Sequence, residues 1–206
     1  GAFDTKAWID HYAEWTDPNP TIGTDTLVSW FNQAVAMQPK STATWFMGKT
    51  LTYAALNEQV VRAAAGLTQL GVRHGDHVAV ALPNCPQHVI AVTAILRLGA
   101  TVVEHNPLYT AAELQPQFED HGARVAIVFD RVAETFSSLS KSTQLETVVA
   151  VNMLEEAPLH LRAALALPIP PVTKLRAELT KPAPGAMPWR EFMRQRSRSV
   201  HFPQIT

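Results

Sequence analysis

The feature that most constrains the fold is the alternation of short apolar runs with helical patterns between positions 51 and 126. Apolar residues in 53–70 recur at intervals of three and four, as they do on one face of an amphipathic helix. Thr52 and Gly71 suit the N-cap and C′ positions of that helix. Strands that alternate with helices at this rhythm form a parallel sheet with helical crossovers. The sequence therefore predicts an α/β fold with a predominantly parallel sheet.

The same alternation extends along most of the chain. The predicted strands lie at 42–47, 77–82, 100–103, 124–129 and 147–151, and the predicted helices at 8–15, 26–37, 53–70, 86–98, 111–121, 131–140, 159–167, 171–179 and 189–194. Thr110 and Glu113 predict a capping box, and Pro116 predicts a kink or a late start in the helix that follows. We expect a helical N-terminal arm at 1–25, an α/β subdomain at 26–152 and an irregular, partly helical extension at 153–206.

The composition limits the class of protein. Of 206 residues, 47% are apolar and 17% are charged, as in a soluble globular protein, and the formal net charge of −1 argues against a nucleic-acid binder. The single cysteine, Cys85, excludes an internal disulfide and suits a reducing compartment. No apolar run approaches the roughly 18 residues of a membrane span, and no signal pattern opens the chain. The start at Gly1-Ala2 suggests a processed or engineered end. We expect a cytoplasmic protein.

A fragment of a phosphate-binding motif at 48–50 is better explained as a hairpin. The first glycine of that motif would have to stand where Ala43 lies. Residues 44–47 are bulky and strand-forming, so their backbone amides cannot wrap around a phosphate. A strand, a turn at 48–49 and a second strand account for the segment. A dinucleotide-binding G-x-G-x-x-G motif after a strand is also absent.

Histidines are the first candidates for catalysis or metal binding. His74 and His77 flank a turn, but neither cysteine nor glutamate stands nearby to complete a zinc site. Asp76, between them, suits a capping role in that turn. His105, with Glu104, follows a predicted strand at its carboxyl end, where open parallel sheets bind ligands. A solvated strand end explains His105 better than a ligand site does.

Cys85 is a weak candidate for a nucleophile. It stands at a predicted helix start, where the helix dipole can lower the pKa of a thiol. The sequence places no histidine beside it as a base, and buried cysteines are usually inert packing. No G-x-S-x-G nucleophile elbow is present either. We therefore expect no covalent catalysis by this chain.

Two further groups of side chains suit surface contacts. Trp8, Tyr12 and Trp15 fall on one face of the predicted first helix; docking on the protein body is the favoured interpretation, and an acyl-chain or membrane contact is the alternative. A basic cluster near the end of the chain could contact phosphates or an acidic membrane, although such runs are more often solvated: Arg190, Arg194, Arg196 and Arg198.

The middle of the chain resembles the adenylate-forming acyl-CoA synthetases, and most of all the bacterial long-chain fatty acid–CoA ligases. Five segments occur in the order and at the spacing of that family, and they are Leu51-Thr52-Tyr53-Ala54-Ala55-Leu56, Gly71-Val72-Arg73-His74-Gly75-Asp76-His77-Val78-Ala79, Leu82-Pro83-Asn84-Cys85-Pro86, Ile95-Leu96-Arg97-Leu98-Gly99-Ala100 and Asn106-Pro107-Leu108-Tyr109-Thr110. The resemblance covers about 26–151 and identifies the chain as the N-terminal subdomain of the large domain of such a ligase.

The resemblance implies a ligase that uses ATP, Mg²⁺ and coenzyme A to convert a fatty acid first to an acyl-adenylate and then to an acyl-CoA. It also implies that this chain is a fragment, because the phosphate loop, the adenine and ribose motifs and the catalytic lysine of the family are missing. By position, Asn106, Pro107 and Leu108 correspond to a turn near the coenzyme A nucleotide in relatives. We expect no catalytic residue, no metal site and no tightly bound cofactor in the fragment itself.

Other interpretations stay open from the sequence. The chain could be a free-standing acyl- or nucleotide-binding or regulatory module, or a fragment of an aryl-CoA ligase or an adenylation domain. The expected partners are the remainder of its own polypeptide, fatty acid and coenzyme A, with no nucleic acid. Peripheral contact with the inner membrane is left open. A fragment of this kind should leave an apolar face or a sheet edge exposed, so we also expect self-association.

Overall fold

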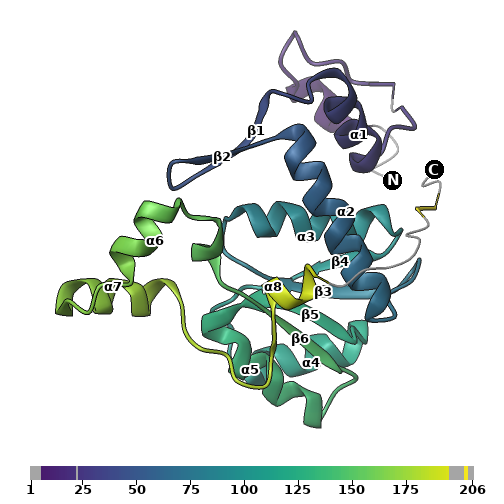
Figure 1. Ribbon diagram of the computed structural model, residues 1–206. Coiled ribbons are helices and arrows are strands. Elements are labelled where there is room, and N and C mark those ends of the chain that lie inside the picture. Colours follow the sequence, from purple (N-terminus) through teal and green to yellow (C-terminus); the bar gives the residue numbers. More distant parts are fainter. Residues whose placement is uncertain (1–5, 22, 195–201, 204–206) are drawn as a thin grey trace.

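The computed structural model describes residues 6–21, 23–194 and 202–203 (Figure 1). Its strands are β1 (Thr42–Phe46), β2 (Lys49–Thr52), β3 (His77–Ala81), β4 (Thr101–Glu104), β5 (Val125–Phe129), β6 (Thr147–Val151) and β7 (Met187–Pro188). Its α-helices are α1 (Leu27–Met37), α2 (Tyr53–Gln69), α3 (Pro86–Arg97), α4 (Ala111–His121), α5 (Ala133–Ser138), α6 (Leu159–Leu165), α7 (Pro170–Leu179) and α8 (Trp189–Phe192). Short 3₁₀ helices are η1 (Ala7–His11), η2 (Asp130–Val132), η3 (Leu139–Lys141) and η4 (Met153–Glu156).

A five-stranded parallel sheet lies at the centre, in the order β4-β3-β5-β6-β7. Val78 of β3 stands opposite Val102 of β4 on one side and Val125 of β5 on the other. The chain runs from β3 outward to β4 and then crosses back over β3 to β5. This is the order of a doubly wound sheet, whose direction of winding reverses between β3 and β5. The predicted α/β fold with a predominantly parallel sheet is confirmed.

Two apolar cores cover the two faces of the sheet. Successive strand residues alternate between them, because neighbouring side chains of a strand point to opposite faces. Val78 and Val80 of β3 pack in the core formed with α2, α3 and α8, whereas Ala79 and Ala81 pack in the core formed with α4 and α5. Small residues in β3 leave room for Phe118 and Phe136 on the second face, both fully buried. The central strands β3, β5 and β6 are largely buried on both sides, as parallel strands with helical crossovers are, whereas Thr101 and Glu104 of the edge strand β4 are exposed.

Local capping residues fix the helix ends as expected. The Thr52 hydroxyl accepts a hydrogen bond from the Ala55 amide at 3.2 Å, and Gly71 adopts a φ of 81° just after α2. Thr110 and Glu113 form the predicted capping box of α4. That helix runs without interruption from residue 111 through Pro116, so the late start does not occur.

The first two strands do not join the parallel sheet. β1 and β2 form a separate antiparallel hairpin, whose tight turn is made by Met47 and Gly48, with φ values of 49° and 89°. Positive φ at both central positions is what a two-residue hairpin turn requires, and glycine meets that requirement without strain. The hairpin prediction is confirmed, with the turn one residue earlier than expected.

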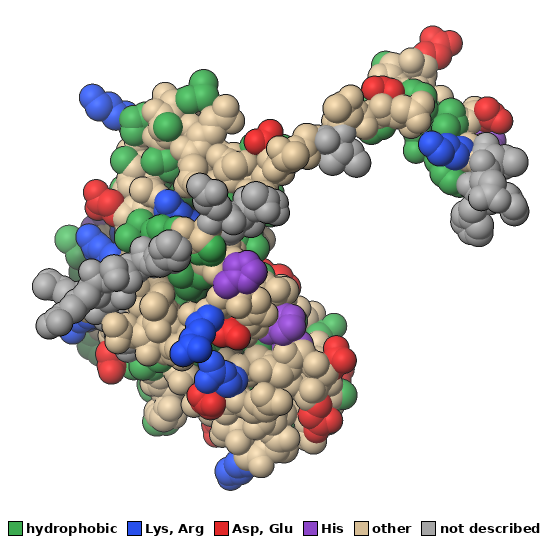
Figure 2. Space-filling view, turned by 90° about the vertical axis from the view of Figure 1, so that its right-hand side faces the viewer, with side chains coloured by type: hydrophobic (Ala, Val, Ile, Leu, Met, Phe, Trp, Pro, Cys, Tyr) green, Lys and Arg blue, Asp and Glu red, His purple; other side chains and the backbone are tan. Residues whose placement is uncertain are grey.

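The predicted helix at 8–15 is wrong. The arm contains the short 3₁₀ helix η1, no residue of which is buried. Trp8, Tyr12 and Trp15 are 44%, 45% and 88% exposed, so this stripe does not dock on the body, and Figure 2 shows the segment before α1 reaching away from it. An isolated helix of this length is marginal in water, and no packing partner stabilises it here. The division of the chain at residues 25 and 152 stays a prediction.

The segment after residue 153 contributes more to the core than expected. Met187 and Pro188 add β7 to the edge of the sheet beside β6, where a proline is tolerated. Trp189 and Phe192, on the short helix α8, are 3% and 0% exposed and pack against each other and the first core. The chain therefore closes one side of its own core from the far end of the sequence.

Candidate functional site

The carboxyl ends of the parallel strands bring together residues that are distant in sequence. Asn84 follows β3, His105 and Asn106 follow β4, Asp130 follows β5 and Asn152 follows β6. Ligands of open α/β sheets bind outside these ends, at the point where the winding reverses. The candidate site is therefore the edge formed by the ends of β3, β4, β5 and β6.

The three residues predicted from the sequence lie together on one exposed turn between β4 and α4. The Asn106 side-chain oxygen accepts a hydrogen bond from the Leu108 amide at 2.9 Å, and its carbonyl accepts one from the Tyr109 amide at 3.1 Å. Leu108 is 85% exposed, and Pro107 is partly exposed. Asn106 thus shapes the turn, and the turn is open to solvent. Its contact with coenzyme A stays a prediction.

A hydrogen bond between side chains joins this edge to α3. His88 Nε2 lies 2.8 Å from Glu104 Oε1, and their side chains are 25% and 50% exposed. His88 follows the start of α3, and Glu104 is the last residue of β4, so the pair ties the edge strand to the neighbouring crossover. Sequence reasoning placed Glu104 correctly at the strand end but did not identify its partner.

His105 is not the solvated strand end that was expected. It is 5% exposed and stacks on Phe118 with a ring distance of 5.1 Å. Its Nδ1 lies 3.0 Å from Gln117 Oε1, and its Nε2 lies 3.2 Å from His121 Nε2. The expectation was wrong because α4 folds over the end of β4, which the sequence of β4 alone does not show.

The hydrogen bonds around His105 fix the protonation of both rings. The Ala123 amide donates to His121 Nδ1 at 3.0 Å, so His121 carries its proton on Nε2 and donates it to His105 Nε2. His105 is then left with its proton on Nδ1, which donates to Gln117. Burial lowers the pKa of His105, and burial together with the neighbouring His105 and His77 lowers the pKa of His121 to about 4. At neutral pH both rings are uncharged, and they form a hydrogen-bonded pair with a structural role.

The lowered pKa of His121 predicts that the chain loses stability in mild acid. The pKa of His121 is about 4 in the fold and about 6.5 in the unfolded chain, so the unfolded chain binds more protons between those values. The free energy of unfolding should be constant above pH 6.5 and fall by about 1–2 kcal/mol towards pH 4, a figure reduced because the ring is partly exposed to water. Urea denaturation at a series of pH values measures it. His121→Gln should flatten this dependence and the exposed control His160→Gln should not; equal slopes in both variants would contradict the assignment.

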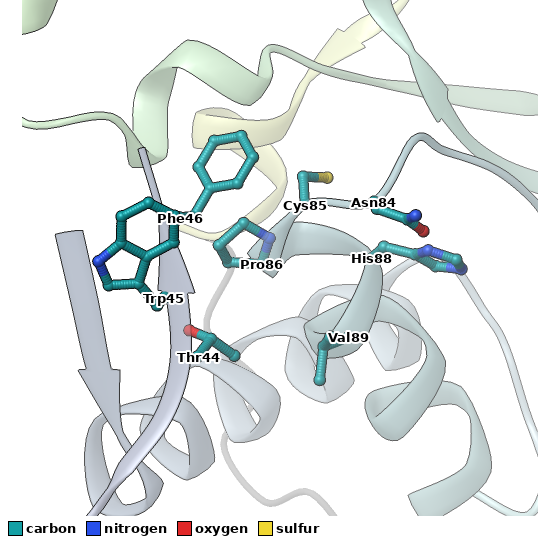
Figure 3. A pocket seen from close by; sticks show the side chains of 8 residues that line it. All are labelled: Thr44, Trp45, Phe46, Asn84, Cys85, Pro86, His88 and Val89. Atoms are coloured by element: carbon teal, nitrogen blue, oxygen red, sulfur yellow. The ribbon is translucent and has the colours of Figure 1, made fainter. Parts of the chain in front are cut away.

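A surface groove lies between the hairpin and the start of α3 (Figure 3). Its volume is about 280 Å³, and the hairpin supplies Thr44, Trp45 and Phe46 on one side. The facing residues are Asn84, Cys85, Pro86, His88 and Val89. The mostly apolar walls can hold an apolar group.

Cys85 offers this groove no nucleophile. Burial raises the pKa of its thiol to about 11, although the amides of His88 and Gln87 oppose the rise. The expected inert packing of Cys85 agrees with its 6% exposure. The helix start does not lower this thiol pKa, because the loss of water outweighs the two amide hydrogen bonds.

A second cavity, of about 420 Å³, lies at the ends of β5 and β6 beneath α7. Asp130, 5% exposed, stands at its base and accepts a hydrogen bond from the Thr180 hydroxyl through Oδ2. Its Oδ1 has no hydrogen-bond partner among the described residues. Burial raises the pKa of this carboxyl, opposed by Thr180 and by the amides of Lys181 and Arg131. Asp130 can therefore accept a hydrogen bond from a ligand or hold a proton.

Sequence reasoning missed Asp130. The available signal was an acidic residue directly after an apolar strand, at the edge of the sheet where ligands bind. Apart from Asn152, the other walls come from residues 173–182, which the sequence pattern assigned to an irregular, partly helical extension. The cavity forms because that extension folds back onto the end of β5.

The segment of the rejected phosphate motif lies in the β1–β2 hairpin, and the two histidines considered as a metal pair lie on either side of a turn. Lys49 forms an ion pair with Glu156 at 2.8 Å from within the hairpin, and no amide cradle surrounds it. Asp76 accepts a hydrogen bond from the Arg73 amide at 2.8 Å and so caps the turn between His74 and His77. In the described part of the chain, no group of three or more His, Cys, Asp or Glu side chains is placed to hold a metal ion.

Only part of the basic cluster near the end of the chain lies within the described residues. Arg190 lies 3.3 Å from Glu155, so it is paired within the fold rather than free in a tail. Arg196 and Arg198 lie outside the described residues.

Comparison with known proteins gives consistent matches. The sequence profile of the AMP-binding enzyme family matches residues 31–184. The long-chain-fatty-acid–CoA ligase of Escherichia coli O6:H1 is 36% identical over 152 residues, covering 72% of this chain and 27% of the relative. The ligase of the same name from Bacillus subtilis is 38% identical over 149 residues, with 72% and 26% covered. This chain therefore spans about a quarter of the length of these relatives.

Solved structures share the fold. The anthranilate CoA ligase AuaEII, crystallised with anthranoyl-AMP, superposes with a TM-score of 0.67 at 19% identity and covers 86% of this chain and 29% of its own. At that identity the likeness concerns the arrangement of strands and helices alone.

Proposed function

Because this chain belongs to the AMP-binding enzyme family, we propose that the protein it comes from is an ATP-dependent long-chain fatty acid–CoA ligase. The observation that carries the proposal is the 36% identity over 152 residues with a long-chain-fatty-acid–CoA ligase. The reaction has two steps: the fatty acid and ATP form an acyl-adenylate and pyrophosphate, and coenzyme A then takes the acyl group and releases AMP. ATP, Mg²⁺ and coenzyme A are its cofactor and substrates.

The proposed role of this chain is that of a scaffold without turnover of its own. Transfer of an adenylyl group requires that phosphate charge be neutralised by backbone amides, a lysine and usually Mg²⁺. The one lysine in a phosphate-loop-like fragment, Lys49, is held by Glu156 at 2.8 Å in a hairpin. The remainder of the polypeptide would supply the phosphate site and be the principal partner.

The turn at Asn106, Pro107 and Leu108 is the proposed contribution to the coenzyme A side. It lies at the carboxyl edge of the sheet, it is exposed, and Asn106 holds its shape through the hydrogen bond to the Leu108 amide. The Leu108 and Tyr109 amides already donate to Asn106, so the turn can contact a nucleotide through the Asn106 side chain and the face of the proline. A cytoplasmic location suits the proposal, because the single cysteine is buried and unpaired.

The alternatives have less support. The likeness to an anthranilate CoA ligase at 19% identity concerns fold, so it does not favour an aryl acid. A free-standing acyl- or nucleotide-binding module could use the groove beside the hairpin, but no observation favours it over the ligase. Self-association through exposed apolar side chains of α1 and the hairpin, such as Trp30 and Trp45, stays a prediction.

A pyrophosphate-release assay tests the proposal. With ATP, Mg²⁺ and palmitate, this chain should give no turnover, whereas the full natural protein should release pyrophosphate and, with coenzyme A, form palmitoyl-CoA. In that full protein Asn106→Ala should raise the KM for coenzyme A several-fold and leave adenylate formation unchanged; Lys40→Ala, also exposed, is the control. Pyrophosphate release by this chain alone would refute the scaffold role, and a full protein that ignores fatty acids would refute the ligase.

A further inference from the structure

Two helices near the end of the chain carry an unusual apolar tip. α6 and α7 stand at one side of the molecule, away from the sheet (Figure 1). Six consecutive uncharged, apolar residues, which form the connection and the first two positions of α7, are all exposed: Ala166, Leu167, Pro168, Ile169, Pro170 and Pro171. We call residues 166–171 the apolar tip. Leu159, at the start of α6, and Leu175, within α7, are further exposed apolar side chains of these helices, with 79% and 48% exposure. Exposed apolar runs of this length normally mark a binding surface.

Basic residues lie close to the apolar tip in the sequence, on the same pair of helices. Residues 159–181 contain four basic residues and one acidic residue, a net charge of +3, although the whole chain has a net charge of −1. Lys174 and Arg176 are exposed and form no ion pair with another described residue, although Arg176 also lines the cavity beside Asp130. We call these two residues the basic collar. Lys181, by contrast, is paired with Glu134 at 3.0 Å.

The backbone of the apolar tip is prepared to leave water. Three of its six residues are prolines, which have no amide hydrogen to satisfy. The amides of Ala166 and Leu167 already donate to carbonyls of α6, at 3.1 Å and 3.2 Å. Burial of an unpaired amide in an apolar phase is costly, so this arrangement lowers the cost of inserting the tip. It also leaves few free amides for pairing with a strand of another protein.

We propose that the hairpin of α6 and α7 docks on the surface of an anionic lipid bilayer. The apolar tip enters the boundary between headgroups and acyl chains, and the basic collar contacts lipid phosphates. In the described part of the chain, no helix has the length and apolarity needed to cross a bilayer, so the contact is peripheral. The proposal is independent of the ligase activity, since binding to vesicles requires no turnover.

The exposed tryptophans of the N-terminal arm are the rival surface. Trp15 is 88% exposed, and aromatic side chains favour membrane interfaces. Residues 1–25, however, contain five acidic residues and one lysine. An anionic surface repels that segment and attracts the basic collar. The pair of helices α6 and α7 is therefore the favoured site.

Co-sedimentation with vesicles tests the proposal. This chain should bind phosphatidylcholine vesicles that contain phosphatidylglycerol, bind pure phosphatidylcholine vesicles far less, and lose affinity when NaCl rises from about 0.1 to about 0.5 M. Reversing both charges of the basic collar, K174E with R176E, should weaken binding by at least about 30-fold, the effect of losing two positive charges. The matched control, K40E with K141E, has the same net charge and should weaken it far less. The exposed-tip variant L167D with I169D should weaken binding about tenfold or more.

A local probe gives a second readout. Cys85 is buried, so Leu167→Cys and Leu108→Cys can be labelled singly with an environment-sensitive dye. A blue shift on mixing with anionic vesicles is expected at position 167 and not at position 108. The proposal is overturned if the chain binds neither kind of vesicle, if binding ignores the tip and collar variants, or if Trp15→Ser abolishes binding while they do not. Retention by a protein partner without any vesicle binding would equally overturn it.

Discussion

Replacing Phe192 by alanine is expected to lower the free energy of unfolding by about 3–5 kcal/mol. Phe192 is 0% exposed and lies in the core that covers one face of the sheet, with its ring centroid 5.2 Å from that of Trp189. The loss combines the transfer of a large apolar side chain to water with the cavity that remains. Urea denaturation of the wild type and the variant measures it. Leu175→Ala, at a side chain 48% exposed, is the control and should change stability by less than about 0.5 kcal/mol.

The partner of Phe192 in α2 makes this prediction specific. A Cβ atom added at Gly66 would lie 2.5 Å from Cε2 of Phe192, closer than carbon atoms can pack. Gly66→Ala alone should therefore destabilise the chain by about 1–3 kcal/mol through overpacking. In the Phe192→Ala background the clash is gone, and the same change should be neutral or stabilise by up to about 1 kcal/mol, because alanine favours a helix. Additive effects in this double-mutant cycle would show that α8 does not pack on α2.

Phe118→Ala should destabilise the opposite face of the sheet by a similar amount, about 3–5 kcal/mol. Phe118 is fully buried and lies 5.9 Å from Phe136 and 5.1 Å from the ring of His105. Its removal also admits water to His105. Because burial is the main cause of the lowered pKa of His105, that pKa should rise towards the ordinary histidine value.

NMR titration of the histidine ring protons measures the second effect. Phe192→Ala is the matched control, because it opens the other core and should leave the pKa of His105 unchanged. Phe118→Leu provides a milder variant if the alanine variant does not stay folded. An unchanged pKa of His105 in a folded Phe118 variant would contradict the proposed cause.

Local signals in the sequence predicted much of the scaffold. The cap at Thr52 and the box of Thr110 and Glu113 depend on residues three positions apart, so they can be identified without any knowledge of the fold. The buried strands are continuous apolar runs bounded by turns, and their alternation with helices indicates parallel pairing. The same local information was insufficient for the N-terminal arm, where a helical pattern exists but no partner stabilises it.

The candidate site could be predicted only in part. The Asn106 turn was predicted through a resemblance that includes its residues; it follows β4, and its contact with coenzyme A stays a prediction. Asp130 was missed because its importance comes from a cavity most of whose other walls lie some 40–50 residues further along the chain. His105 was placed at a strand end, yet its burial depends on Phe118 and His121 of the next helix.

The sequence by itself determined the class of fold, the order of its main strands and helices, and the family to which the chain belongs, because these depend on local periodicity, capping and motif order. The tertiary structure alone decided which polar groups are buried, which face Phe192 closes, and where apolar surface remains uncovered at the apolar tip. Those properties depend on contacts between segments far apart in the chain. Burial changes the pKa of a side chain, and the close approach of a ring to a glycine decides a packing fit, only once those segments are in place.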